Sequence, residues 1–310
     1  MDKKRLKNLL EKEAWVYEFL AKEYQADKEL AGVAVNNGDV FAFVPKKLQQ
    51  DKEVILAAIE WDGLPYEASE EWYEDMDILR ALVAVEPWNY EEFPEEVQNN
   101  REIALECVKV RGDVYESLPE EWKEDEEIAE EAIRHGQSLK EFRNYLDNPA
   151  SKTAEKLLSR ADLVHTAIEK NDGNQMIYAD EKLWGNKKLA EFALAKGFCH
   201  IRHLSDKQKA EKETVKRVIR NIPENNSSDE WFQLIYMAEQ LRFDKEFLLE
   251  LISIHEMVFH TIVQSQKDPR IEELFTRFPV LDDDFCKKAY AANKKCIKYM
   301  NKKMKAAVKQ

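Results

Sequence analysis

The chain has 310 residues, of which 44% are apolar and 35% are charged, and its formal net charge at pH 7 is −14. This composition is typical of an ordered protein, and the lack of any run of about 18 apolar residues argues against a membrane-spanning helix. The charge is unevenly distributed. Between Glu60 and Glu131 there are 25 acidic and 5 basic residues, whereas residues 285–310 contain nine lysines and no acid.

The N-terminal segment is predicted to be a single capping helix covering residues 1–26. Its apolar side consists of Leu6, Leu9, Leu10, Trp15, Val16 and Leu20. The charged start of the chain leads directly into this amphipathic pattern, so we expect no signal peptide.

A sequence repeat of about 24 to 25 residues follows. It starts at Asp27, Asp51, Asp75, Asn100 and Asp125, with weaker copies at Arg160, Asn186 and Glu211 and eroded ones near Asp244 and Asp282. A self-similar segment of this length is typical of a stacked array of small modules.

The first half of each repeat is predicted to be a helix of about ten residues. Its fourth, fifth, eighth and ninth residues are apolar, as in Val54, Ile55, Ala58 and Ile59, and this spacing places them on one helical face. Acidic residues in the first turn suit the helix dipole. The glycines that follow are predicted to end these helices at positive φ: Gly38, Gly63, Gly112, Gly136, Gly173 and Gly197.

A short second helix is predicted after each glycine, because Pro or Ser precedes two polar residues and an apolar anchor, as in Leu118-Pro119-Glu120-Glu121-Trp122. In this pattern Trp72 and Trp122 are predicted to be core residues. Neither helix is long enough to be stable alone in water, so successive repeats must pack together. A leucine-rich repeat has a similar length, but the apolar spacing of three and four favours helices over its strand.

The predicted fold class is therefore all-α, a superhelical array (α-solenoid) of short two-helix repeats with a more irregular helical C-terminal third. Residues 27–148 form the regular acidic repeats, residues 149–221 the divergent repeats, and residues 222–310 irregular helices that end in a basic amphipathic helix. We expect one continuous array and not independent domains.

The repeat resembles a bacterial family of short helical repeats that is known only as a domain of unknown function. The resemblance lies in residues 44–48, 51–59 and Gly63, and again in residues 118–122, Asp125, Ile128, Ala132, Ile133 and Gly136. It covers residues 27–148 closely and residues 160–220 loosely. It implies a helical-repeat fold and brings no catalytic residues.

No motif indicates catalysis, and we predict no enzyme activity, no cofactor and no metal. His255-Glu256 begins like a zinc-protease helix, but Phe259 stands where the second histidine belongs. Cys199, His200 and His203 lie close in sequence but lack a fourth ligand for a structural zinc site. An enzyme with residues scattered through the divergent half is the third alternative for function.

The acidic repeats carry the candidate binding surface for a protein partner with a basic surface. Its residues are Trp61, Tyr66, Trp88, Tyr90, Glu91, Glu92, Glu95, Glu96, Tyr115, Glu120 and Glu121. Aromatic rings among carboxylates favour a protein interface, although such rings can also cover seams between repeats. The prediction is a non-enzymatic interaction scaffold or inhibitor, and the alternative is an acidic mimic of nucleic acid that blocks another protein.

The basic tail is the second charged feature. Lys294, Lys295, Lys298, Lys302, Lys303 and Lys305 are predicted to lie on the terminal helix. This helix could contact another molecule or dock on the acidic repeats of its own chain. Four cysteines without a paired spacing indicate a reducing compartment, so the predicted location is the cytoplasm.

Overall fold

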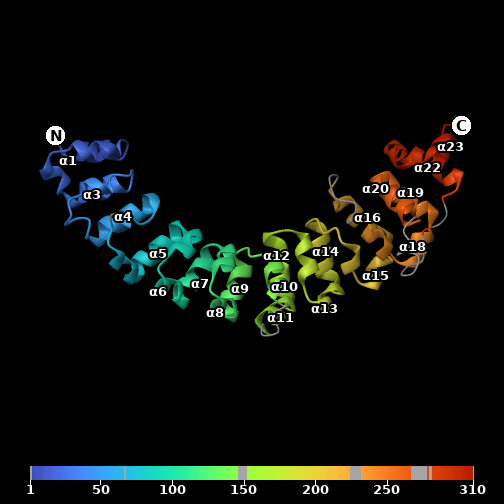
Figure 1. Ribbon diagram of the computed structural model, residues 1–310, viewed down its shortest axis with the longest axis horizontal. Coiled ribbons are helices and arrows are strands. Elements are labelled where there is room, and N and C mark those ends of the chain that lie inside the picture. The colour runs from blue at the N-terminus through green and yellow to red at the C-terminus, as the bar shows by residue number, and fades with distance from the viewer. Residues whose placement is uncertain are drawn as a thin grey trace. The chain divides into compact units, whose positions relative to one another are not determined.

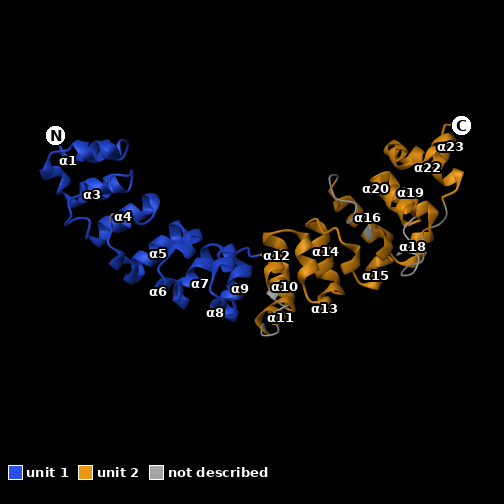
Figure 2. Cartoon of the chain, in the orientation of Figure 1, with its two compact units in different colours: residues 1–137 blue, residues 138–310 orange. Residues whose placement is uncertain are grey.

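The computed structural model is helical throughout the part of the chain that it describes, residues 2–65, 68–145, 152–223, 232–266, 278 and 281–309, and these residues form no strand. They divide into two compact units, residues 1–137 and 138–310 (Figure 2). This boundary precedes the one that the sequence suggests at residues 148 and 149.

Unit 1 is built from recurring modules, each with a long α-helix followed by shorter helical elements. Consecutive long helices contact one another from α1 to α9 (Figure 1). In chain order the elements are α1 (Lys3–Leu10), η1 (Ala14–Phe19), α2 (Lys22–Gln25), α3 (Lys28–Val35), η2 (Phe41–Phe43), α4 (Lys52–Asp62), η3 (Glu70–Glu74), α5 (Met76–Val85), η4 (Pro87–Glu92), α6 (Glu95–Gln98), α7 (Arg101–Val110), η5 (Gly112–Ser117), α8 (Glu120–Lys123) and α9 (Glu126–Arg134), where η denotes a 3₁₀-helix.

The predicted long helices are confirmed, together with their buried columns. The first residue of each repeat is the N-cap, and the Asp75 carboxylate accepts hydrogen bonds from the backbone N–H groups of Asp77 and Ile78. In α4 the buried residues are the four predicted ones, Val54, Ile55, Ala58 and Ile59. Burying one such side chain of the size of valine or isoleucine stabilises the fold by about 1.5–3 kcal/mol.

The prediction of two helices per repeat is incomplete, because in several modules a 3₁₀-helix lies between the long and the short helix, and in the module of α4 the short element is itself the 3₁₀-helix η3. In the module that begins with α7, for example, η5 separates α7 from α8. For the same reason the prediction of one helix over residues 1–26 is wrong. This segment forms α1, η1 and α2, and Trp15, expected on the apolar face, is 60% exposed.

The glycines serve two different purposes, and only one was predicted. Gly63, Gly136 and Gly197 have positive φ, as expected for residues that end a helix. Gly112 does not. A Cβ atom on Gly112 would lie 2.2 Å from the carbonyl oxygen of Ala132. This glycine is therefore required by the close approach of the next long helix.

Unit 2 continues the same element order with more variation. Its elements are α10 (Leu139–Tyr145), α11 (Lys152–Leu158), α12 (Ala161–Lys170), η6 (Gly173–Tyr178), α13 (Glu181–Trp184), α14 (Lys187–Ala195), η7 (Ile201–His203), α15 (Asp206–Lys209), α16 (Lys212–Asn221), η8 (Phe232–Tyr236), α18 (Glu239–Phe243), α19 (Lys245–Ile254), α20 (Met257–Ser265), α22 (Asp283–Ala292), η9 (Lys294–Tyr299) and α23 (Lys302–Ala307).

The prediction of a single basic helix at the C-terminal end is wrong. Residues 283–307 form α22, η9 and α23 in the module order, not one continuous helix. Asp282 caps α22 by accepting a hydrogen bond from the N–H of Phe285, and Asn293 and Asn301 begin the two shorter elements in the same way. The asparagines therefore divide the lysine-rich stretch into three helices.

Candidate protein-binding surface

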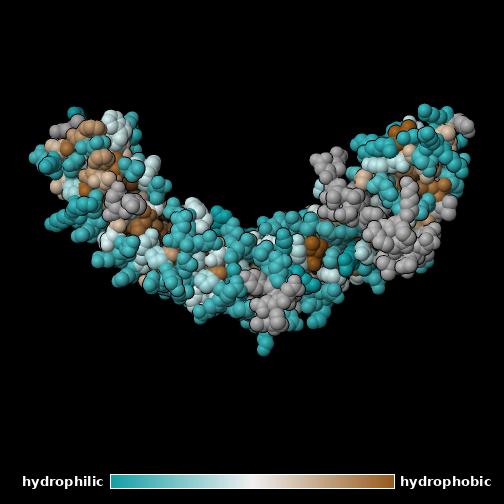
Figure 3. All heavy atoms as spheres, viewed as in Figure 1, coloured by the Kyte–Doolittle hydropathy of each residue, from teal (hydrophilic) through white to brown (hydrophobic). Residues whose placement is uncertain are grey.

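Six predicted glutamates form what we call the acidic edge: Glu91, Glu92, Glu95, Glu96, Glu120 and Glu121. All six are exposed. Glu91 and Glu92 end η4, whereas the other four occupy the first turns of the short helices α6 and α8. Figure 3 shows hydrophilic residues over most of the visible surface of this part of unit 1.

The module geometry explains why these carboxylates form a row. Pro94 and Pro119 precede α6 and α8, so each short helix starts at the same point of its module. The partial positive charge of a helix N-terminus favours acids in the first turn. Because α6 and α8 occupy equivalent places in consecutive modules, a pair of glutamates recurs from one module to the next.

The basic residues of this region do not neutralise the acidic edge, because most are held elsewhere. Arg80 pairs with Glu102 and Glu106, and Arg101 pairs with Asp125 and Glu127. Arg111 and Lys123 also have carboxylate partners, Asp113 and Glu120, and of these only Glu120 belongs to the edge. The acidic edge therefore keeps a strong excess of negative charge.

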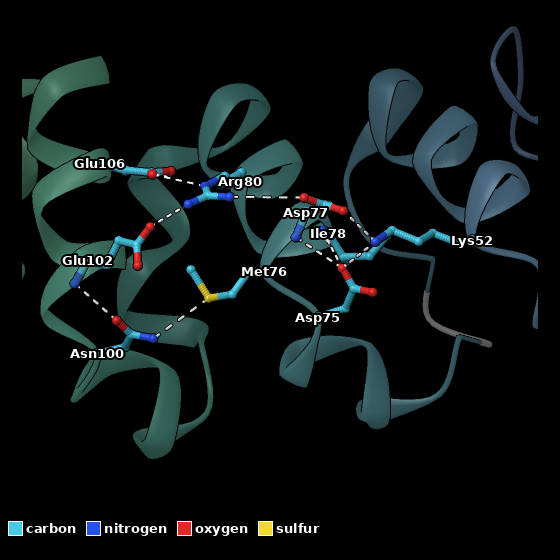
Figure 4. Close-up of polar contacts among 9 residues, drawn as sticks. All are labelled: Lys52, Asp75, Met76, Asp77, Ile78, Arg80, Asn100, Glu102 and Glu106. Atoms are coloured by element: carbon cyan, nitrogen blue, oxygen red, sulfur yellow. Dashed lines mark hydrogen bonds and ion pairs between the residues drawn. The ribbon is translucent and has the colours of Figure 1, made fainter.

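Ion pairs join consecutive long helices at their N-termini (Figure 4). Lys52 is the first residue of α4. Its ammonium lies 2.8 Å from the carboxylate of Asp75, which caps α5, and 2.6 Å from the carboxylate of Asp77 in the first turn of α5. This contact with Lys52 lowers the pKa of Asp75 from its ordinary value. The same arrangement recurs as Lys3–Asp27, Lys28–Asp51, Arg101–Asp125, Lys212–Asp244 and Lys245–Asp282.

This pattern was missed by the sequence analysis, although the sequence contains it. Where the first residue of a long helix is a cation, the N-cap of the next long helix is acidic. Where that first residue is uncharged, the N-cap of the next long helix is a neutral asparagine. Met76 follows the cap of α5, and the next cap is Asn100, whose side-chain amide approaches the Met76 sulfur at 3.9 Å (Figure 4). Likewise Ala161 begins α12 and Asn186 caps α14. Comparing each first residue with the next cap would have revealed the rule.

The two predicted surface tryptophans are exposed. Trp61, at the end of α4, is 51% exposed and borders a cleft of about 300 Å³ that Gly38, Phe41 and Pro65 also line. Trp88, in η4, is 55% exposed, and the Arg111 guanidinium lies 5.8 Å from its ring centroid. Trp72 and Trp122, predicted as core residues, are half-buried.

The predicted surface role of Tyr90 and Tyr115 is wrong, because both side chains are buried in the core. The Tyr90 hydroxyl donates a hydrogen bond to the backbone carbonyl of Gln98, and the Tyr115 hydroxyl donates to that of Lys123 at 2.7 Å. Burial raises the pKa of the Tyr90 phenol. These tyrosines fasten each 3₁₀-helix to the short helix that follows. Tyr66 lies outside the described residues.

Further exposed aromatic residues were not predicted. Trp15 and Phe19 of η1 are 60% and 70% exposed and contact each other edge to face, with ring centroids 6.0 Å apart. Trp15 and Trp88 occupy equivalent positions, each two residues before a buried tyrosine. That Trp-x-Tyr spacing was the signal available in the sequence.

The basic tail lies on η9 and α23. Lys294, Lys295 and Lys298 belong to η9, and Lys302, Lys303 and Lys305 to α23. Lys298 is tied to the rest of unit 2, because its ammonium lies 2.9 Å from the carboxylate of Glu256. Lys302 and Lys303 are exposed and form no ion pair with any described residue.

The Cys199, His200 and His203 stretch is largely buried. The rings of His200 and His203 lie 6.2 Å apart, and burial lowers the pKa of His203 to about 4. The buried Nδ1 atom of His203 and the buried Nε1 atom of Trp184 have no hydrogen-bond partner among the described residues. Within the described residues no three His, Cys, Asp or Glu side chains form a metal-binding group. Also within these residues, no helix has the length and apolar character needed to cross a membrane.

Part of the chain is similar to a known family of domains. A family model described as a domain of unknown function, DUF4116, matches residues 75–123 and residues 100–147. The two matches begin at Asp75 and Asn100, the N-caps of α5 and α7, so one model fits the chain twice with an offset of one module. No curated protein and no solved structure matches the chain.

Proposed function

We propose that the modules stack in order into an α-solenoid and that the protein is a non-enzymatic interaction scaffold or inhibitor. Its partner is a protein with a basic surface, which binds at the acidic edge. The observation that carries this proposal is the recurrence of exposed glutamates at equivalent points of consecutive modules, in a region whose cations are mostly paired elsewhere.

We propose that Trp61 and Trp88 supply the apolar part of the interface. Exposed tryptophans are frequent anchors in protein interfaces, where truncation of one anchor costs about 2 kcal/mol or more of binding energy. Both rings belong to unit 1, as does the acidic edge. We propose that the carboxylates attract the partner and that the rings hold it once bound.

We further propose that the protein acts in the cytoplasm. All four cysteines are free thiols and buried, and burial raises the pKa of Cys107 to about 12. Thiols without disulfides are typical of a reducing compartment.

The test uses the full chain as bait in an extract of its native cells, with quantitative mass spectrometry of the retained proteins. The variant reverses the acidic edge to lysine at all six positions. The matched control reverses six exposed carboxylates of unit 2: Glu155, Glu169, Glu181, Asp206, Glu239 and Glu246. We expect wild type and control to retain the same basic protein and the edge variant to lose it.

Retention of that protein by the edge variant would refute the proposal. A second arm adds nucleic acid as a competitor. Displacement of the captured protein by nucleic acid would favour the alternative of an acidic decoy at a nucleic-acid-binding site. Replacing Trp61 and Trp88 by alanine should speed dissociation more than it slows association, because apolar anchors act after encounter.

A further inference from the structure

The C-terminal module carries positive charge at the positions where unit 1 carries negative charge. Lys302 and Lys303 are the first two residues of the short helix α23, as Glu95 and Glu96 are of α6. Lys298 is the fifth residue of η9, as Glu91 is of η4. One module framework therefore presents two edges of opposite sign. We call the exposed residues Lys295, Lys302 and Lys303 the basic edge.

Local helix stability does not explain the basic edge. The partial positive charge of a helix N-terminus disfavours cations in the first turn, by about 0.3–1 kcal/mol each. The first turns of the other short helices of the described chain each contain an acid, as in α2, α6, α8, α13, α15 and α18. The short helix α23 differs from these six helices, because it begins with two lysines and has no acid in its first turn. Lys302 and Lys303 therefore do not stabilise their own helix, and they occupy the point of the module where the short helices of unit 1 carry glutamates.

We propose that the basic edge of one molecule binds the acidic edge of a second copy of the chain. The two edges belong to modules with the same element order, so their charged residues recur at equivalent points and can face one another. Lys302 and Lys303 face the glutamate pair of a short helix, either Glu95 and Glu96 or Glu120 and Glu121.

The chemistry of the basic edge favours a carboxylate partner over nucleic acid. Single-stranded nucleic acid is held by stacking of its bases on exposed aromatic rings. The rings of this module lie under lysines instead, with the Lys294 ammonium 4.1 Å from the Tyr290 ring centroid and the Lys298 ammonium 4.9 Å from that of Tyr299.

The contact joins two different surfaces and is therefore heterologous. Each molecule carries both edges, so association continues beyond a dimer unless the arrangement closes into a ring. The contact consists of exposed charges, so it weakens as salt shortens the distance over which they act. This inference shares the acidic edge with the proposed function, but only self-association requires the basic edge.

The test is sedimentation velocity of the purified full-length protein over a range of concentrations, at about 0.03 M and about 0.5 M salt. We expect concentration-dependent assembly at low salt and monomers at high salt. Two variants carry charge reversals, an acidic-edge variant (Glu95→Lys, Glu96→Lys, Glu120→Lys, Glu121→Lys) and a basic-edge variant (Lys302→Glu, Lys303→Glu). Each should self-associate at least about tenfold more weakly than wild type.

Mixing the two variants is the decisive measurement. The mixture contains lysine edges on one protein and glutamate edges on the other, so association should return although neither variant assembles alone. The matched control is Lys187→Glu with Lys188→Glu, an exposed lysine pair in the first turn of α14, which should assemble like wild type. Circular dichroism confirms that each variant is folded.

Wild type that remains monomeric at every concentration and salt would overturn the inference, as would a mixture that does not associate. Assembly that appears only after addition of RNA or of anionic vesicles would also overturn it, since it would assign the basic edge to a phosphate polyanion. A basic-edge variant that still captures a basic partner leaves the proposed function standing, whatever its self-association.

Discussion

Replacement of Gly112 by alanine tests the claim that close helix approach, and not backbone conformation, requires this glycine. The new Cβ would lie 2.2 Å from the Ala132 carbonyl oxygen and 2.7 Å from the Gln137 nitrogen, both of which are backbone atoms. Because backbone cannot move aside as a flexible side chain can, α9 must shift away from η5. The shift also strains the hydrogen bond from the Gly112 N–H to the His135 carbonyl, which is 3.2 Å long.

The expected loss of stability is about 2–4 kcal/mol. Overpacking costs about 1–3 kcal/mol, and a weakened hydrogen bond adds about 1 kcal/mol. Two other glycines are controls. Gly136→Ala meets no atom within 4 Å but has φ of +108°, so only backbone strain of about 1–2 kcal/mol applies. Gly32→Ala lies in the open on helix α3 and should stabilise the protein by about 0.5–1 kcal/mol.

The assay is urea unfolding followed by tryptophan fluorescence. Five of the seven tryptophans precede residue 137, so fluorescence reports mainly on unit 1. The expected order of stability is Gly32→Ala, wild type, Gly136→Ala and then Gly112→Ala. If Gly112→Ala proved as stable as Gly136→Ala, the reasoning from close approach would be refuted.

Three further predictions concern ion pairs, buried tyrosines and a buried histidine. Lys52→Glu should lower the midpoint of urea unfolding at low salt and lower it less at high salt, whereas Lys47→Glu, an exposed control, should leave the midpoint close to that of wild type. Tyr90→Phe should cost only about 1 kcal/mol in the same assay, because the Gln98 carbonyl still accepts a hydrogen bond from the indole N–H of Trp122 at 2.9 Å. A loss above about 3 kcal/mol would contradict this. The pKa of His203 is about 4 in the folded protein, below its ordinary value of 6.5, so its contribution to stability is complete above pH 6.5 and is lost as the pH falls toward 4. The full pKa shift corresponds to about 3 kcal/mol, and the expected loss is smaller than this because the ring is only half-buried. If a His203→Phe variant showed the same pH dependence of unfolding as wild type between pH 7 and pH 4.5, His203 would be excluded as the cause.

The candidate surface shows how far residue type alone can mislead. The aromatic residues Trp88 and Tyr90 lie two positions apart on η4, yet Trp88 is exposed and Tyr90 is buried. Helical spacing predicts burial only when the kind of helix is known, and the residue pattern of η4 does not distinguish a 3₁₀-helix from an α-helix. The glutamates were easier to place, because consecutive charges after a proline favour the exposed first turn of a helix.

The sequence by itself determined the long helices, because a capping Asp or Asn and apolar residues spaced by three and four act locally within about ten residues. It also contained the polarised charge and the rule that links the first residue of one long helix to the cap of the next. Only the tertiary structure decided which glycines are confined by a neighbouring helix and which tyrosines are buried. Those features depend on atoms that meet across modules or across a turn of the chain, and local spacing carries no information about distances between separate helices.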